Sequence, residues 1–192
     1  MKTNRLEAFS DGVLAIILTI MVLEMKAPQG EDLLILQHHV LPKFLCYVLS
    51  FIYVGIYWNN HHHMMHLVNR VTGSVLWANL HLLFWLSLIP FATAWMGENH
   101  FSSLPTALYG VVLLMCAAAY WVLQKTAIAS EGANSALALA VGKDYKGKLS
   151  TLLYVFAIAS AFIIPWFAKI IFILVALIWF IPDKRIERVL PR

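Results

Sequence analysis

Long runs of apolar residues, separated by short polar stretches, dominate this sequence. A membrane-spanning helix needs about 20 such residues, because it rises 1.5 Å per residue across a hydrocarbon core of about 30 Å. The pattern therefore predicts an all-α integral membrane protein. Its six transmembrane helices are expected at approximately 6–25, 36–64, 73–95, 104–127, 149–164 and 166–181.

The last two predicted spans are short and meet at Pro165. Proline is favoured in the first turn of a helix, so we expect a tight hairpin whose second helix begins there, with one long kinked helix as the alternative. Residues 128–148 form a connector, either a cytoplasmic loop or a short interfacial helix, and residues 182–192 form a basic tail. Residues 1–192 make a single domain without an internal repeat. A central pore therefore requires several subunits.

Lysine and arginine predict the orientation of the spans, because cytoplasmic loops of membrane proteins carry an excess of both. With six spans and a cytoplasmic N-terminus, both termini lie inside. Three basic residues then face outward, namely Lys26, Lys43 and Lys169. The other 11 face the cytoplasm, namely Lys2, Arg5, Arg70, Lys125, Lys143, Lys146, Lys148, Lys184, Arg185, Arg188 and Arg192.

The composition agrees with a membrane protein. Of the 192 residues, 61% are hydrophobic and 12% are charged, and the mean hydropathy is +0.75. The net charge of +4 suits membrane topology, so no nucleic-acid partner is expected. Cys46 and Cys116 lie in apolar runs, which favours small buried side chains over a disulfide or a zinc site.

Ser10 and Asp11 lie one to two turns inside the first apolar run. An ionisable group at this depth suggests a functional site. The alternative is a structural role at headgroup level, where the helix dipole favours an anion and Arg5 can pair with Asp11. If Arg5, Ser10 and Asp11 instead form a buried hydrogen-bonded anchor that orients the first helix, Asp11→Ala should impair folding or assembly more than ion selectivity.

An apolar stripe continues along the first predicted helix. Its members recur at helical spacing and share one face, namely Gly12, Ile16, Thr19, Ile20 and Leu23. On a helix that faces lipid, such a stripe is ordinary, and Thr19 bonds its own backbone. Around a symmetric pore, the same stripe makes rings of isoleucine and leucine that gate by dewetting. Periodicity alone does not choose between these interpretations.

Three motifs in the first half of the chain point to one family. R-x-x-x-F-S-D is present as Arg5, Phe9, Ser10 and Asp11; the later stretches are YWNNHH, with Trp58, His61 and His62, and WANLHLLFWLSLIPFATAW, with Trp77, Asn79, Pro90 and Phe91. Together they resemble the transmembrane protein 175 family of endolysosomal potassium channels and their prokaryotic relatives. The second half resembles this family mainly in its number of spans.

The resemblance implies a homotetramer of six-helix subunits, with four copies of the first helix lining the conduction path. It places the constriction at Ile16, a selectivity-tuning hydroxyl at Thr19 and a further apolar ring at Leu23, with Gly12 and Ile20 as other pore-facing candidates. It also implies a polar network of Arg5, Phe9, Ser10, Asp11, a histidine (His61 or His62), Trp77 and Asn79. A single six-helix unit favours a bacterial plasma membrane.

The familiar T-V-G-Y-G selectivity filter does not occur in this sequence. A potassium channel of this kind therefore does not replace the ion's water with rings of backbone carbonyls. Side-chain methyl groups favour the cation that loses water more cheaply, so we expect a weak to moderate preference for K⁺ over Na⁺. No bound cofactor is expected, and the partners are other copies of the chain, membrane lipid and permeant monovalent cations.

The histidine run NNHHHMMH suggests metal or haem as an alternative. His62 and His66 are spaced i and i+4, which suits a shared cation, and His81 lies in the next span. No cysteine or carboxylate lies close to them in sequence, although a closed metal site takes four ligands. Bis-histidine haem needs two facing histidines at matched depth, for which His62 and His81 are the candidates.

A proton channel or proton-coupled transporter is the main functional alternative, because histidines titrate near neutral pH and lie in the same motifs as Asp11. Transporters tend to contain repeats and helices broken at mid-membrane, whereas Pro90 lies toward the end of its predicted span. An enzyme is the weakest hypothesis. The sequence contains no H-E-x-x-H, no G-x-S-x-G and no phosphate loop.

Overall fold

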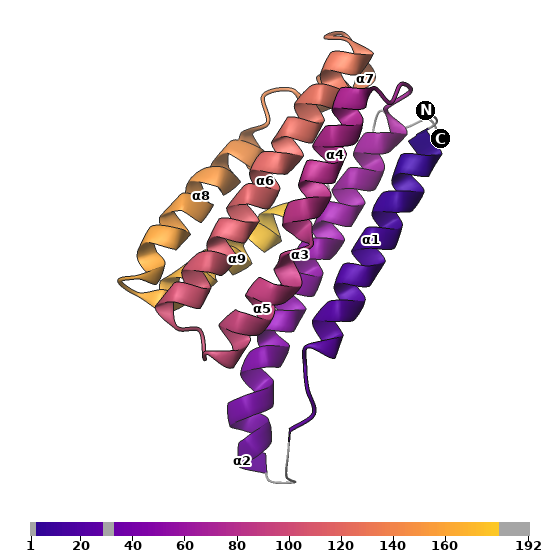
Figure 1. Cartoon of the computed structure of the whole chain (residues 1–192). Helices are drawn as coiled ribbons and strands as arrows, with labels where there is room; N and C mark the ends of the chain where they lie inside the picture. Colours follow the sequence, from indigo (N-terminus) through magenta and orange to yellow (C-terminus); the bar gives the residue numbers. More distant parts are fainter. Residues whose placement is uncertain (1–2, 29–32, 181–192) are drawn as a thin grey trace.

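The computed structural model describes residues 3–28 and 33–180, and its regular elements in these ranges are all helical (Figure 1). The predicted all-α class is therefore confirmed. The basic tail 182–192 lies outside the described residues. The elements in chain order are α1 (Thr3–Leu23), α2 (Leu33–Ile35), the π-helix η1 (Leu36–Val40), α3 (Leu41–His66), α4 (Gly73–Leu86), α5 (Ile89–Glu98), α6 (Ser103–Glu131), α7 (Ala136–Val141), α8 (Tyr145–Ala161) and α9 (Pro165–Phe180).

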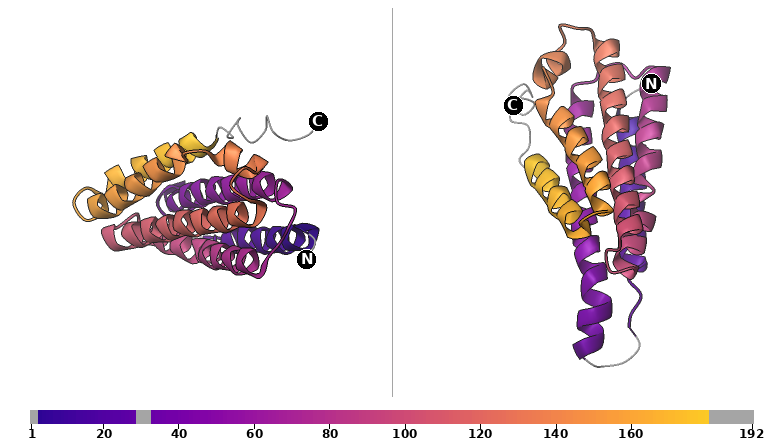
Figure 2. Two further views of the ribbon diagram at one scale, coloured as in Figure 1. Left: turned by 90° about the horizontal axis from the view of Figure 1, so that it is seen from above. Right: turned by 90° about the vertical axis from the view of Figure 1, so that its left-hand side faces the viewer.

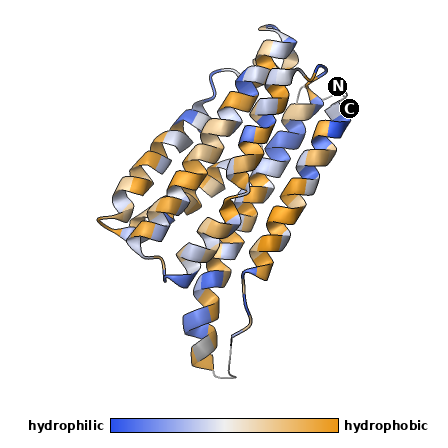
Figure 3. Ribbon diagram, viewed as in Figure 1, coloured by the Kyte–Doolittle hydropathy of each residue, from blue (hydrophilic) through white to orange (hydrophobic). Residues whose placement is uncertain are grey.

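Four helical segments are long and apolar enough to cross a membrane: Thr3–Leu23, Leu36–His66, Gly73–Glu98 and Ser103–Glu131. Pro165–Phe180 is apolar but shorter, and α8 has 17 residues. Hydrophobic residues cover most of the main helices, as Figure 3 shows. The chain is therefore an integral membrane protein, while the number of six spans stays a prediction.

The second span is longer than expected and contains a π-helical turn. Pro42 lies in the first turn of α3 and has no backbone N–H, so the α-helical bond to the carbonyl of His38 is absent. The π-helix η1, Leu36–Val40, immediately precedes α3 at this point. The N-terminal end of the segment projects beyond the neighbouring helices (Figure 2).

The third predicted span is two helices instead of one. α4 ends at Leu86 and α5 begins at Ile89, with Pro90 in its first turn. The Ser87 hydroxyl donates to the Phe84 carbonyl at 2.7 Å at the break. The sequence placed Pro90 toward the end of a predicted span, whereas the interruption beside it lies well inside Gly73–Glu98.

α6 lies at the centre of the fold and packs against α4, α5, α8 and α9. Gly110 allows close approach, because a Cβ at this position would lie 2.9 Å from Ile158 Cγ1 and 3.1 Å from Phe172 Cζ. Buried hydroxyls also join three helices: Ser50 Oγ is 2.7 Å from Thr93 Oγ1 and 2.9 Å from Tyr109 Oη. These hydrogen bonds hold α3, α5 and α6 together and fix the position of each helix along the others, which apolar packing alone does less specifically.

The C-terminal half ends in a helical hairpin. α8 and α9 are separate helices that pack against each other, and Pro165 is the first residue of α9. Trp179 Nε1 donates to Ser150 Oγ at 2.7 Å across the pair. The hairpin therefore replaces the alternative of one kinked helix. In the connector, α6 continues to Glu131 and the short helix α7 follows, with the Ser135 side chain capping its N-terminus.

α1 lies at the edge of the bundle, on the side opposite to the α8–α9 hairpin (Figures 1 and 2). It packs against α3, α4 and α5. In its most apolar window only 28% of the residues are buried, compared with 56% in α6. Most of the surface of α1 is therefore left uncovered by its own subunit.

Candidate functional site

The face of α1 that packs against the rest of the subunit is a single stripe of buried residues. Its residues recur every three or four positions and are Leu6, Ser10, Leu14, Ile17 and Met21. Four of them are apolar and pack into the core, while Ser10 is polar and completely buried. The first helix is therefore held to the subunit by apolar packing with one buried polar position among it.

The predicted pore stripe lies outside this buried face. Gly12, Ile16, Thr19, Ile20 and Leu23 are all exposed, with Ile16 at 59% and Leu23 at 70%. The Thr19 hydroxyl donates to the Ala15 carbonyl at 2.9 Å, one turn earlier. In a membrane protein an apolar face of this kind is covered either by lipid or by another protein chain. Their pore-lining role stays a prediction.

Ser10 begins a buried chain of side-chain hydrogen bonds. The Asn79 amide donates to Ser10 Oγ at 3.0 Å, and Ser10 Oγ donates to the Leu6 carbonyl at 2.9 Å. Asn79 Oδ1 lies 2.8 Å from His61 Nε2. Because an amide oxygen only accepts, His61 carries its proton on Nε2 in this arrangement. The chain links α1, α4 and α3, and each of the three side chains is at least 97% buried.

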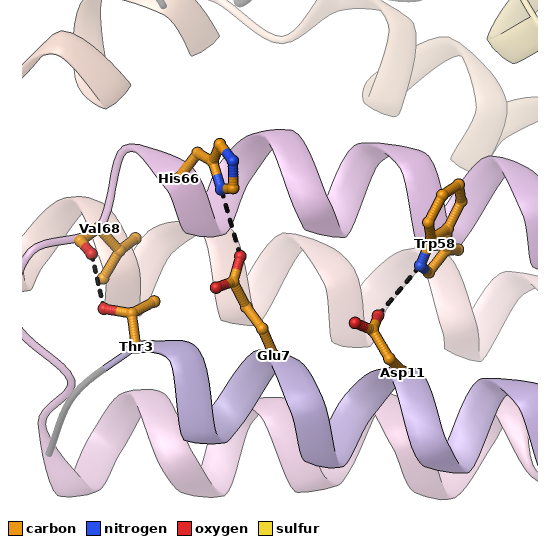
Figure 4. Close-up of polar contacts among 6 residues, drawn as sticks. All are labelled: Thr3, Glu7, Asp11, Trp58, His66 and Val68. Atoms are coloured by element: carbon orange, nitrogen blue, oxygen red, sulfur yellow. Dashed lines mark hydrogen bonds and ion pairs between the residues drawn. The ribbon is translucent and has the colours of Figure 1, made fainter.

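A second set of contacts joins α1 to α3 and to the segment that follows α3, along the edge of the bundle (Figure 4). The Thr3 hydroxyl donates to the Val68 carbonyl at 2.9 Å, and Glu7 Oε1 lies 3.3 Å from His66 Nδ1. Trp58 Nε1 donates to Asp11 Oδ1 at 3.0 Å. Asp11 is therefore bonded to an indole, and among the described residues it forms no ion pair with Arg5.

The structure brings together only part of the predicted polar network. Ser10, His61 and Asn79 are in contact, and His61 rather than His62 bonds Asn79. Five candidates take no part in this hydrogen-bonded chain. Asp11 bonds Trp58, Arg5 and Phe9 are exposed on α1, Trp77 is 74% exposed on α4, and His62 packs beside Trp58 and His66. What these residues do in an assembled channel stays a prediction.

Several residues in the contacts of α1 were not expected, among them Glu7 and Trp58. Both carry a signal that the sequence contains. Thr3, Glu7 and Asp11 are spaced by four residues on α1, and Trp58, His62 and His66 have the same spacing on α3. This spacing places each set on one face of its helix, and the two faces meet because α1 and α3 pack through them.

The residues best suited to hold a metal are Glu7, His62 and His66. One ligand atom from each lies within 4.8 Å of the other two. The carboxylate that is absent from the neighbouring sequence thus comes from another helix. For haem, His81 is less suited, because its Nε2 accepts a hydrogen bond from Trp85 Nε1 at 3.0 Å.

A cavity of about 380 Å³ lies in another part of the molecule. Residues of α3, α6, α8 and α9 line it, including Tyr57, Ala118, Tyr154 and Trp179, together with Asp144 before α8. No residue of α1 contributes to its lining. This cavity is therefore separate from the exposed stripe of the first helix.

The sequence relatives of this chain are potassium channels. The family described as endosomal/lysosomal potassium channel TMEM175 matches residues 5–90. A potassium channel of Chryseobacterium sp. (strain P1-3) is 57% identical over 188 residues, which cover 98% of this chain and 97% of that protein. A potassium channel of Chamaesiphon minutus is 31% identical over 178 residues, which cover 86% of this chain and 87% of that protein.

The fold leads to the same family. The crystal structure of a lysosomal potassium-selective channel TMEM175 homolog from Chamaesiphon minutus superposes with a TM-score of 0.80 at 28% identity. The match covers 94% of this chain and 97% of the other. The R-x-x-x-F-S-D segment and the second- and third-span motifs all lie within residues 5–90. This chain therefore belongs to the TMEM175 family of potassium channels.

Proposed function

We propose that this protein is a potassium-permeable channel in which four subunits surround a central path lined by α1. Ile16 forms the narrowest ring, Thr19 supplies hydroxyls one turn away, and Leu23 forms a further apolar ring. Gly12 and Ile20 complete the lining. The potassium channel names of the relatives support K⁺ as the permeant ion.

The observation that carries this proposal is the division of α1 into two faces. Ser10 and the apolar residues of the buried stripe fix one side of the helix to α3, α4 and α5. The opposite side presents Ile16 and Leu23 outward, at 59% and 70% exposure. A helix at the edge of the bundle with such a face is placed to meet identical helices around an axis.

A ring of isoleucine side chains discriminates among cations through their hydration. Methyl groups provide no oxygen to replace lost water, so an ion that passes pays part of its dehydration free energy. K⁺ holds its water less tightly than Na⁺, which favours K⁺. A narrow apolar ring also tends to dewet, so it can serve as the gate. We therefore expect weak to moderate selectivity.

We further propose a bacterial plasma membrane with both termini in the cytoplasm. The beginning of α1 and the α3–α4 connection lie at the same end of the bundle (Figure 1). Arg5 and Arg70 are at that end. Lys43 lies at the other end of α3, where it pairs with Glu98 at 3.1 Å. The predicted excess of basic residues on the cytoplasmic side supports this orientation.

Ion flux from reconstituted liposomes tests the proposal through Ile16. In vesicles with a potassium gradient, Ile16→Asn should increase K⁺ flux and reduce discrimination against Na⁺, because a polar ring wets and coordinates either cation. The assembly should remain four times the subunit mass of 21.7 kDa, measured by light scattering. Leu177→Asn is the matched control, since Leu177 on α9 is 58% exposed and should not affect flux.

Two results would contradict the proposal. If Ile16→Asn and Leu177→Asn both leave flux unchanged, Ile16 faces lipid and the constriction lies elsewhere, with Leu23 as the next position to substitute. If the purified protein conducts K⁺ as a single 21.7 kDa subunit, α1 does not line a shared axis.

A further inference from the structure

Glu7, His62 and His66 form a cluster of three metal-ligating side chains between α1 and α3. We propose that this cluster binds a divalent transition-metal ion of the zinc class, which links the beginning of the first helix to the end of the second span. The inference concerns metal binding by the purified protein, so it is independent of ion conduction.

The distances within the cluster are close to those of a metal site. One ligand atom from each residue lies within 4.8 Å of the other two, and Glu7 Oε1 lies 3.3 Å from His66 Nδ1. With Zn–N and Zn–O bonds of about 2.0–2.1 Å, tetrahedral ligand atoms are about 3.4 Å apart. Glu7 and His66 already have this separation, and a ligand atom of His62 lies within 4.8 Å of a ligand atom on each of them.

The backbone holds the three residues in register. His62 and His66 are one turn apart on α3, and their ring centroids are 4.3 Å apart. Glu7 approaches from α1, as Figure 4 shows for its contact with His66. On one side, the Trp58 ring stacks on His62 with 6.1 Å between the centroids, and its indole N–H bonds Asp11. Such outer contacts orient metal ligands.

The donor set selects the class of metal. Two imidazole nitrogens and one carboxylate oxygen suit Zn²⁺, Cu²⁺ or Ni²⁺, whereas Mg²⁺ and Ca²⁺ prefer oxygen ligands. Three protein ligands leave a fourth position for water. The cluster is accessible for this, because the His66 side chain is 48% exposed while that of Glu7 is 19% exposed.

Zn²⁺ titration of the purified full-length protein, in competition with a chromogenic chelator, tests this site. The expected result is one Zn²⁺ per subunit, with no comparable binding of Mg²⁺. Removing even an outer partner of a metal ligand costs about 10 to 100-fold in affinity. We therefore expect Glu7→Gln or His62→Gln to weaken Zn²⁺ binding at least tenfold. His39→Gln, which removes an exposed imidazole outside the cluster, should leave this binding unchanged.

A spectroscopic measurement on the unmodified protein keeps the test independent of variant folding. X-ray absorption at the zinc edge should show two imidazole nitrogens together with oxygen ligands. Equal Zn²⁺ affinity in Glu7→Gln, His62→Gln and the unsubstituted protein would overturn the proposal. So would loss of binding in His39→Gln, or a spectrum without imidazole, and Glu7 and His66 would then form a hydrogen bond only.

Discussion

Among the five residues of the predicted pore stripe, Thr19 alone carries a hydroxyl. In the subunit this hydroxyl donates to the Ala15 carbonyl at 2.9 Å, so its oxygen lone pairs stay available on the exposed side. Four such oxygens around an axis can contact a partly dehydrated cation. At this position a hydroxyl therefore offers what the methyl groups of Ile16 do not.

We expect Thr19→Val to reduce the permeability ratio of K⁺ to Na⁺ while the assembly stays intact, because valine keeps the shape and removes the oxygen. Reversal potentials measured with K⁺ and Na⁺ on opposite sides of the membrane give this ratio. Thr19→Ser is the matched variant that retains the hydroxyl and should stay close to the unsubstituted channel. An unchanged ratio in Thr19→Val would show that the hydroxyl does not take part in selectivity.

Single contacts were the least predictable level from sequence. The run HHHMMH offers successive histidines on different sides of α3, and only the packing of α4 shows that His61 meets Asn79. Arg5 was a reasonable partner for Asp11 by charge, yet Trp58 approaches from α3 and takes the contact. Residue spacing in the sequence shows which side chains share a face of one helix. These bonds also depend on how two helices are rotated against each other, which the spacing does not give.

At the scale of helices, the buried chain from Ser10 through Asn79 to His61 fixes the rotation of α1 against α3 and α4. We expect Asn79→Ala to lower the stability of the purified protein by about 1–3 kcal/mol, since it leaves a buried polar group without a partner. The affected group is mainly His61 Nε2–H, because Ser10 retains its bond to Leu6. A thermal unfolding series in one detergent measures the effect.

Asp11→Asn provides the comparison for Asn79→Ala. Asp11 is exposed, and an asparagine oxygen can still accept from Trp58, so a much smaller loss of stability is expected. The structure thus moves the expected anchoring role from Asp11 toward Asn79. If Asp11→Asn destabilises the protein as much as Asn79→Ala does, the buried chain is not the main anchor.

Hydropathy predicted where apolar helices occur, and two prolines, Pro42 and Pro90, accompany the interruptions that it did not predict. Pro165 starts α9 as expected. Pro42 accompanies a π-helical turn, and Pro90 follows a break between α4 and α5. Hydropathy averaged over about 20 residues detects neither feature, because both lie within segments that are apolar on average. The break also weakens one sequence argument against a transporter, because helices broken inside the membrane are common in that class.

At the scale of the whole molecule, the prediction of a tetramer depended on the resemblance to a known family. The absence of an internal repeat indicated that several subunits are needed, but no pattern within one chain defines the symmetry of an assembly. The exposed stripe of α1 is compatible with lipid or with other copies of α1, since both cover apolar side chains. The family match supports the second interpretation, and conduction experiments must distinguish the ions that such an assembly carries.

Proton transport is the alternative to test at this scale, and the placement of the titratable groups gives an expectation. Asp11 bonds Trp58, and His61 is buried against Asn79, so both contacts are directed toward α3 and α4 rather than along the stripe of Ile16 and Leu23. We expect the reversal potential to follow the K⁺ gradient at equal pH and to stay near zero under a pH gradient at equal K⁺. A reversal potential that follows pH, and is lost in Asp11→Asn but retained in Leu177→Asn, would identify a proton pathway through Asp11 and replace the potassium channel proposal.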